Sequence, residues 1–93
     1  MKVINVSLSV KPGKESEYEA FIDKLVQGSL AEAGNLDYGH FKKLGTDDEY
    51  EIIEHWKDAA AVESHNGTAH FQEFLAHVGD YVTKDPEIIR MDN

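Results

Sequence analysis

The chain has 93 residues, the size of a single domain spanning residues 1–93, and it contains no Cys, which excludes disulfides, thiolate metal sites and a Cys nucleophile. Nine basic residues against 18 acidic ones leave a net charge of −9, which argues against nucleic acid or an anionic membrane as a partner. No apolar run approaches the roughly 20 residues of a membrane span, and the N-terminus shows no signal-peptide pattern. We therefore expect a cytoplasmic protein.

The apolar pattern changes period along the chain and predicts seven elements. Residues 2–10 alternate apolar and polar positions, as in a strand with one buried face, whereas residues 14–33 have apolar side chains at helical spacing. Asp58 and Thr68 are suitable N-caps for two later helices. In chain order, the predicted elements are a strand at 2–10, a helix at 14–33, strands at 36–44 and 49–56, helices at 58–65 and 68–82, and a strand at 87–91.

This order predicts an α+β fold of the ferredoxin-like, split βαβ type. Its strands would form a four-stranded antiparallel sheet, with the helices packed on one face. The opposite face would then be uncovered, although strands carry apolar residues on both sides, such as Ile52 and Ile53. An uncovered face of this kind predicts a partner, most simply a second copy in a two-fold homodimer.

Four short segments in this order resemble the antibiotic biosynthesis monooxygenase domain family of the dimeric α+β barrel group. They are Lys-Pro-Gly at 11–13, Glu-Ala-Gly-Asn-Leu-Asp-Tyr at 32–38, Glu-His-Trp-Lys-Asp at 54–58, and His65 with Thr-Ala-His-Phe at 68–71. The resemblance covers nearly the whole chain. It implies a homodimer whose two sheets pack into a barrel, with a pocket between sheet and helices in each subunit.

The best-known members of this family oxygenate phenolic or quinol-like aromatics with O2 and use neither metal nor flavin. A deprotonated phenol is electron-rich and can react with O2 itself, so the protein need only supply a dry aromatic-lined cavity and a base. The resemblance therefore implies a monooxygenase of a small aromatic substrate, with no cofactor and no metal. Quinol monooxygenases are the most similar members, because they share Glu54, Trp56, His65 and His70.

Other members of the group match less well. Where a polyketide-oxidising member has a pocket Asn and Tyr, this chain has Ile52 and Val62, which cannot form hydrogen bonds. Haem-degrading members use a helix His as the iron ligand, and Leu75 stands at that position. A third relative isomerises a phosphorylated signalling sugar, and its spaced His residues have counterparts here in His65 and His70.

Seven residues are candidates for the site, each with a structural alternative. His70 and His65 are candidate proton-transfer groups. His65 can instead close the C-terminus of its helix, and His70 can instead hold the corner between the two helices. Trp56, Glu54, Asn5, Ser7 and Tyr38 are candidate substrate-binding residues. Glu54 shares a strand face with Trp56, so burial would oblige it to find a partner, for which one of the two His residues is the obvious choice.

Asn5 and Ser7 occupy the polar side of the first strand, where they can either hold a substrate oxygen or satisfy a neighbour. His70, Glu73 and His77 share a helix face, but their spacing fits no standard zinc motif. Two further functions stay open beside the oxygenase. One is an isomerase of a small signalling metabolite, and the other is a dimer that binds a small ligand without catalysis.

Overall fold

The computed structural model describes all residues from 1 to 93. Its elements in chain order are β1 (Lys2–Ser9), α1 (Glu15–Leu30), β2 (Asn35–Lys42), β3 (Glu49–Trp56), α2 (Ala59–Asn66), α3 (Ala69–His77), a 3-10 turn (Val78–Asp80) and β4 (Glu87–Asp92). The four strands form one antiparallel sheet in the order β2-β3-β1-β4. This is the predicted α+β ferredoxin-like arrangement.

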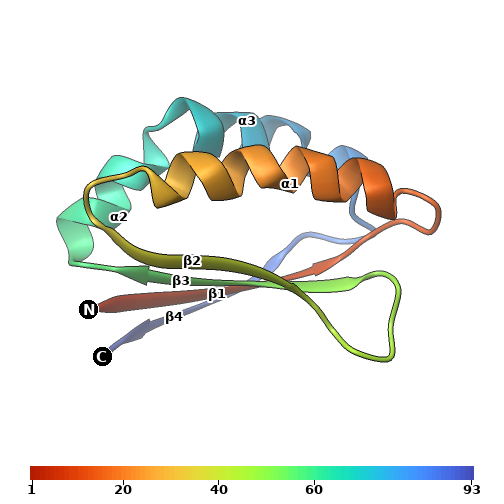
Figure 1. Cartoon of the computed structure of the whole chain (residues 1–93), viewed down its shortest axis with the longest axis horizontal. Coiled ribbons are helices and arrows are strands. Elements are labelled where there is room, and N and C mark those ends of the chain that lie inside the picture. The colour runs from red at the N-terminus through yellow and green to blue at the C-terminus, as the bar shows by residue number, and fades with distance from the viewer.

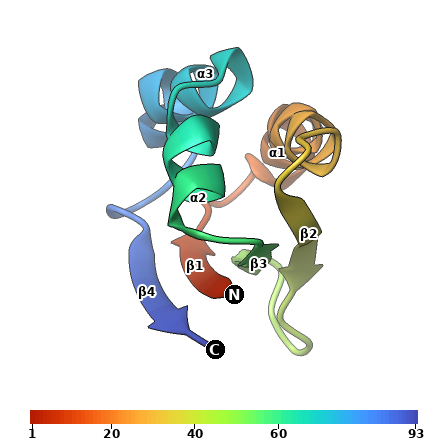
Figure 2. The same cartoon turned by 90° about the vertical axis from the view of Figure 1, so that its left-hand side faces the viewer.

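The three helices lie on one face of the sheet (Figures 1 and 2). Helix α1 runs along the sheet beside α3, while α2 lies over the ends of the strands near both chain termini (Figures 1 and 2). Because α2 and α3 follow β3 directly, the segment from Trp56 to Phe71 folds back over the sheet from that end. The two chain ends lie beside each other, since Lys2 pairs with Asp92 in the sheet.

Alternation along the strands places the core between the sheet and the helices. In β3, Tyr50, Ile52, Glu54 and Trp56 are all buried, and the residues between them are only partly buried. Trp56 has no exposed surface at all. The period of 2 predicted this face, and it brings a carboxyl group and an indole to the inner side of the sheet.

The outer face of the sheet has no covering layer (Figure 2). Ile53, Asn5 and Ile89 lie next to one another across three strands of this face. The side chain of Phe41 lies over Gly39, whose missing Cβ would stand 2.6 Å from the Phe41 ring. Ile89 and Phe41 keep more than half of their surface exposed, at 58% and 53%. The uncovered apolar face that the sequence predicts is therefore present.

Several elements differ from the sequence-based expectation. Helix α1 ends at Leu30 instead of residue 33, and β2 ends at Lys42 instead of residue 44. The predicted helix to about residue 82 ends at His77 and tightens into the 3-10 turn, after which Val82 forms an isolated bridge to Val10. The bridge between Val82 and Val10 thus outweighs the helical spacing of the apolar residues before Val82. The second strand contains an irregularity between Asn35 and Asp37, which leaves Leu36 58% exposed instead of buried beside Tyr38.

Candidate functional site

A small cavity lies between the sheet and helices α2 and α3. Its volume is about 70 Å³, which is less than ordinary ligand sites occupy. Its apolar wall includes Val6, Ile52, Phe71, Phe74 and Leu75. Its polar wall consists of Tyr38, Glu54, His65, Asn66 and Arg90. An apolar cavity with a few convergent polar groups is the arrangement expected of a small-molecule site.

His65 is the best-defined polar group in this wall. It stands in the last turn of α2. The start of this helix is fixed by the Asp58 side chain, which accepts a hydrogen bond from the Ala61 amide. The residue is only 2% exposed, and its ring packs 4.4 Å from the Trp56 ring and 4.8 Å from the Phe71 ring, measured between centroids. These contacts hold the imidazole in one orientation.

The two ring nitrogens of His65 have different surroundings. Nδ1 lies 2.6 Å from Glu32 Oε2, whereas Nε2 makes no hydrogen bond within the protein. Because the carboxylate can only accept, it favours the tautomer with the proton on Nδ1. Nε2 is then left with a free lone pair in a residue that lines the cavity. This is the arrangement that a general base requires.

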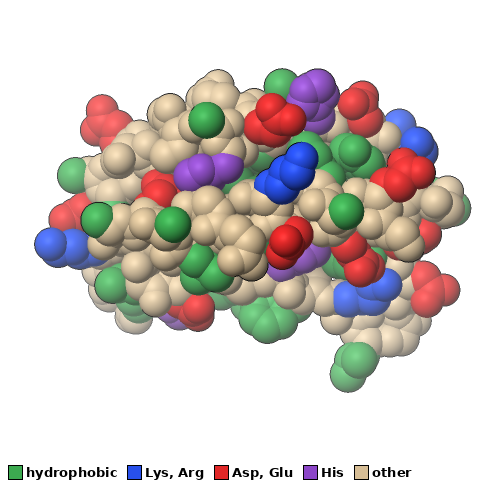
Figure 3. Space-filling model, turned by 45° about the horizontal axis from the view of Figure 1, so that its top comes forward, with side chains coloured by type: hydrophobic (Ala, Val, Ile, Leu, Met, Phe, Trp, Pro, Cys, Tyr) green, Lys and Arg blue, Asp and Glu red, His purple; other side chains and the backbone are tan.

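Glu32 joins His65 to a second histidine. The same oxygen, Oε2, lies 2.7 Å from Nε2 of His70 in the first turn of α3. The exposed fraction of the side chain rises along this row, from 3% for His65 to 14% for Glu32 and 22% for His70. The row therefore leads from the cavity wall to the surface of the helical layer, where histidine side chains are visible (Figure 3).

Burial determines the protonation state of His65. Desolvation lowers the pKa of its imidazole, and hydrogen bonding to Glu32 opposes this effect without overcoming it. As the pH falls below 7, the His65 ring is consequently protonated at a lower pH than the ring of an exposed histidine. A neutral ring near pH 7 keeps the lone pair on Nε2 available.

Glu54 is the second ionisable group of the cavity wall. It is 5% exposed, and its Oε1 accepts a hydrogen bond of 2.9 Å from Nε1 of Trp56. Burial raises the pKa of its carboxyl from 4.5 to about 7, although the Trp56 hydrogen bond and the charge of Arg90 act in the opposite direction. Glu54 can thus be protonated or charged near neutral pH.

Tyr38 completes this group of side chains from β2. Its ring centroid lies 6.1 Å from that of His65 and 6.3 Å from that of Trp56. Burial raises the pKa of its phenol, and the charge of Glu54 adds to this effect. Tyr38 therefore stays neutral, and its phenol lies within reach of the Ser29 hydroxyl of α1.

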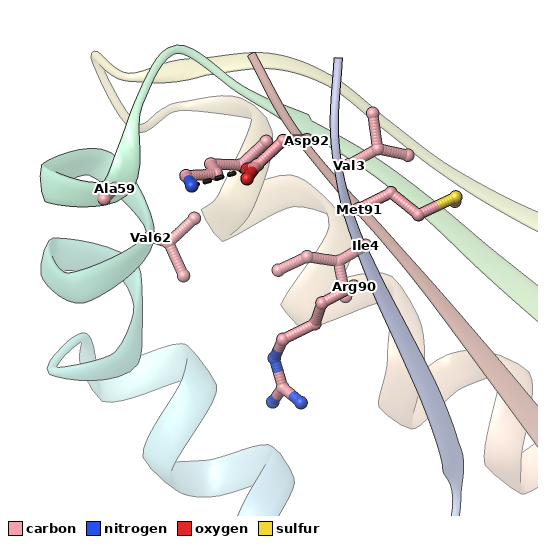
Figure 4. Close-up of a pocket in the computed structure, with 8 residues that line it drawn as sticks. Val3, Ile4, Ala59, Val62, Arg90, Met91 and Asp92 are labelled. Carbon is pink, nitrogen blue, oxygen red and sulfur yellow. Dashed lines mark hydrogen bonds and ion pairs between the residues drawn. The ribbon is translucent and has the colours of Figure 1, made fainter.

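An outer pocket of about 320 Å³ adjoins the cavity at the open end between β4 and α2 (Figure 4). Ile4, Val62 and Arg90 line both spaces and so form the boundary between them. The outer pocket has the size of an ordinary ligand site, whereas the inner cavity does not. A ligand of one or two rings would accordingly extend from one space into the other.

The structure brings five of the seven predicted site residues together and separates two. His65, Glu54 and Tyr38 line the cavity. Trp56 lies behind His65 and does not reach the cavity, and His70 stands on the outer side of Glu32. These two residues support the wall from behind.

Asn5 and Ser7 lie on the other face of the sheet. Ser7 donates a hydrogen bond to Glu51, and Asn5 stands between Ile53 and Ile89. They cannot contact a ligand beside His65 in the same subunit, because the sheet lies between them and the cavity. The strand alternation noted in the sequence already placed them opposite Ile4 and Val6.

The partner of the two histidines differs from the one expected. Glu54 bonds Trp56, its neighbour two residues along the strand, and the carboxylate between the histidines is Glu32. Glu32 follows helix α1, and no local pattern in the sequence links it to His65, 33 positions later. Arg90 also lines this cavity, a position that follows from its pairing with Ile4 in the sheet and not from any local pattern in the sequence.

Glu32, His65 and His70 are also the one group of side chains with the spacing of a metal site. The three ligand atoms lie within 4.8 Å of one another, and two imidazoles with one carboxylate are a set that binds divalent transition metals. The other set considered from the sequence, with His70, Glu73 and His77, shows no such convergence. Metal binding at the Glu32 group would compete with the hydrogen bonds described above.

The fold and this cavity define a small α+β protein with a histidine-containing site between sheet and helices. The sequence model of the family described as antibiotic biosynthesis monooxygenase matches residues 1–77. The chain belongs to this family. None of its helices is both long and apolar enough to cross a membrane.

Similar proteins cover the whole length of the chain. "Putative monooxygenase YcnE" of Bacillus subtilis (strain 168) is 38% identical over 92 residues, which are 99% of this chain and 97% of that protein. The crystal structure of PA3566 from Pseudomonas aeruginosa is 27% identical with a TM-score of 0.90, covering 99% of this chain and 92% of that one. A crystal structure described as an antibiotic biosynthesis monooxygenase has a TM-score of 0.92 at 24% identity, covering 100% and 98%, and shows the fold.

Proposed function

We propose that this protein is a monooxygenase that needs no cofactor and acts on a small phenolic or quinol-like aromatic in the cavity beside His65. The observation that carries the proposal is the orientation of His65. Its Nδ1 is held by Glu32 at 2.6 Å, and its Nε2 is free in a largely apolar wall. Membership of the monooxygenase family and the similarity to YcnE support the same reaction class.

The first step assigned to the protein is removal of a phenolic proton. Nε2 of His65 accepts it, and the resulting imidazolium is stabilised by the Glu32 carboxylate. The phenolate left behind is electron-rich, and it reacts with O2 beside the aromatic ring of Tyr38, which lines the cavity. Glu32 and then His70 offer a route for the proton to the surface, because each bonds the next.

The electron balance of a quinol substrate closes without another reductant. One oxygen atom of O2 is inserted into a ring C–H bond, and the other leaves as water. The ring is oxidised to a hydroxyquinone, and all four electrons that O2 takes up come from the substrate. The protein therefore has to provide deprotonation, orientation and a dry cavity.

Oxygen uptake by EDTA-treated protein tests the proposal with a panel of hydroquinones, naphthoquinols and anthrones. We expect uptake above the autoxidation background, and a loss of about 10²- to 10⁴-fold in His65→Gln, the size of a general-base contribution. Glu32→Gln keeps a hydrogen-bonding group but removes the charge, so it should lower the rate less than His65→Gln does. His77→Gln is the matched control, because His77 is an exposed histidine on the same helix layer.

Uptake that survives in His65→Gln would contradict the role of this residue. Uptake that disappears after EDTA treatment and returns with a divalent metal would replace the proposal with a metal-dependent reaction at Glu32, His65 and His70. No uptake across the panel by the untreated protein would leave no support for an oxygenase.

An isomerase is the second candidate function. His65 and Glu54 line the same cavity, one with a free lone pair and the other with a carboxyl group that titrates at about 7. Such a pair can remove a proton from one atom of a carbonyl compound and return one to another. Exchange of a substrate C–H for deuterium from D2O without O2 consumption would favour this function over the oxygenase.

A further inference from the structure

Arg90 stands at the boundary between the cavity and the outer pocket and is the only Arg in the chain. It pairs with Ile4 across the sheet, so its side chain lies on the same face as this buried residue. Figure 4 shows the guanidinium extending from β4 into the space between the sheet and the helices. The side chain thus reaches toward the helices, while β4 itself is the edge strand of the sheet.

The guanidinium has no partner in the protein. The other cation of the outer pocket, Lys2, forms an ion pair with Asp92, but Arg90 makes neither an ion pair nor a hydrogen bond (Figure 4). Among the residues that line the two spaces, Arg90 is therefore the one cation without an ion pair. Its five N–H donors are therefore available to a ligand.

We propose that Arg90 binds a carboxylate group of the substrate, so that the protein acts on a hydroxylated aromatic acid instead of an uncharged phenol or quinol. This inference rests on the proposed function, because it names the substrate class of the same cavity. The carboxylate lies against the guanidinium at the boundary, and the ring extends past Ile4 and Val62 toward His65.

The size of the two spaces supports this orientation. The inner cavity of about 70 Å³ cannot enclose a whole ligand of ordinary size, whereas the outer pocket of about 320 Å³ can hold the remainder. A substrate must then extend across the boundary between the two spaces, which Arg90 lines together with Ile4 and Val62. A charged end is stabilised at this mouth and would be costly to bury beside Val6 and Phe74.

A carboxylate fits the site better than a phosphate does. The planar guanidinium fork matches the two oxygens of one carboxylate in a bidentate pair. A phosphate dianion would need further cations, and the remaining charged groups of the two spaces are Glu54 and the paired Lys2 and Asp92. Glu54, the carboxyl group of the inner cavity, would repel a dianion more strongly than a monoanion.

Binding measurements test this inference independently of turnover. Dissociation constants for 2,5-dihydroxybenzoate and its methyl ester are measured anaerobically by calorimetry and by Trp56 fluorescence. Arg90→Gln removes the charge and keeps a polar side chain of related shape. Lys24→Gln is the matched control, because it makes the same change in net charge on α1, away from both spaces.

We expect the wild type and Lys24→Gln to bind the acid about 10- to 100-fold more tightly than the ester, as a charge-assisted pair allows. In Arg90→Gln this preference should disappear while the affinity for the ester stays the same. The preference of the wild type should also shrink at high salt, since the boundary is open to solvent.

Equal binding of acid and ester by the wild type would overturn the inference, as would a preference that persists in Arg90→Gln. Failure to bind the acid at millimolar concentration would also overturn it. The two proposals fail separately. Selective binding without O2 uptake keeps the carboxylate site and removes the oxygenase, and uptake with uncharged quinols alone does the reverse.

Discussion

At the scale of single residues, Glu54 is held where its charge is unfavourable. Its only hydrogen bond comes from Trp56, and burial raises the pKa of its carboxyl to about 7. The folded protein therefore binds this proton more tightly than the unfolded chain does. Between pH 4.5 and about 7 the unfolded state loses the proton first, so this group lowers the free energy of unfolding as pH rises.

This difference predicts the effect of Glu54→Gln. At about 1.4 kcal/mol for each pH unit, the interval from 4.5 to about 7 corresponds to at most about 3 kcal/mol. Above pH 7 we expect the variant to be more stable than the wild type by up to this amount, because the amide keeps the Trp56 hydrogen bond and carries no charge. Below pH 4.5 the two proteins should have similar stability. Urea denaturation across pH measures the difference, and a constant difference would contradict the raised pKa.

The placement of some site residues was predictable from the sequence, and that of others was not. Strand alternation placed Glu54 and Trp56 together on the inner face and Asn5 and Ser7 on the outer one. It could not identify Glu32 as the partner of His65, because that contact joins the end of α1 to the end of α2. Contacts of this kind depend on how the helices pack, and the local spacing of apolar residues carries no information on that packing.

At the scale of elements, the position of His70 depends on the close approach of α1 and α3. Gly28 in α1 lies against the His70 ring, and a Cβ built at this residue would stand 2.5 Å from the ring atoms Cγ and Nδ1. A glycine within a helix ordinarily costs about 1 kcal/mol relative to Ala. The close approach of the two helices explains why a glycine occurs at this point.

Gly28→Ala should therefore lower stability by about 1–3 kcal/mol, because overpacking outweighs the gain in helix propensity. It should also displace His70 from Glu32. Gly79→Ala is the matched control, since a Cβ at Gly79 meets nothing within 4 Å. Thermal unfolding reports the stability, and histidine NMR resonances report the His70–Glu32 contact. Stabilisation by Gly28→Ala equal to that of the control would contradict the close packing.

Element order was predictable because hydrophobic period, caps and turn residues agree with one another. The caps at Asp58 and Thr68 both form as expected, each accepting from a backbone amide three residues later. The early end of α3 was not predictable from spacing, because the bridge between Val10 and Val82 is a long-range contact. Local signals fix where helices begin here better than where they end.

At the scale of the whole molecule, the uncovered sheet face calls for a partner. Ile53 and Ile89 flank Asn5 on this face, and the Asn5 Oδ1 is buried without a hydrogen-bond donor. We propose that a second copy of the chain packs on this face. The resemblance to dimeric α+β barrels leads to the same expectation.

Light scattering at micromolar concentration should accordingly give the mass of a dimer. Ile53→Asp should shift the mass toward that of a monomer, because a charge at the centre of an apolar contact is costly. Leu44→Asp is the control, since Leu44 is 97% exposed at the tip of the hairpin between β2 and β3. A monomeric wild type, or a dimer unaffected by Ile53→Asp, would contradict an interface on this face.

The measurement that tests the central claim most directly is isotope labelling of the product. EDTA-treated protein is incubated with the best substrate of the uptake panel under ¹⁸O2, and product and water are analysed by mass spectrometry. We predict that the product gains one ¹⁸O atom, that the second appears in water, and that His65→Gln abolishes labelling above the autoxidation background. A product without ¹⁸O, or equal labelling in wild type and His65→Gln, would contradict a monooxygenase that acts through His65.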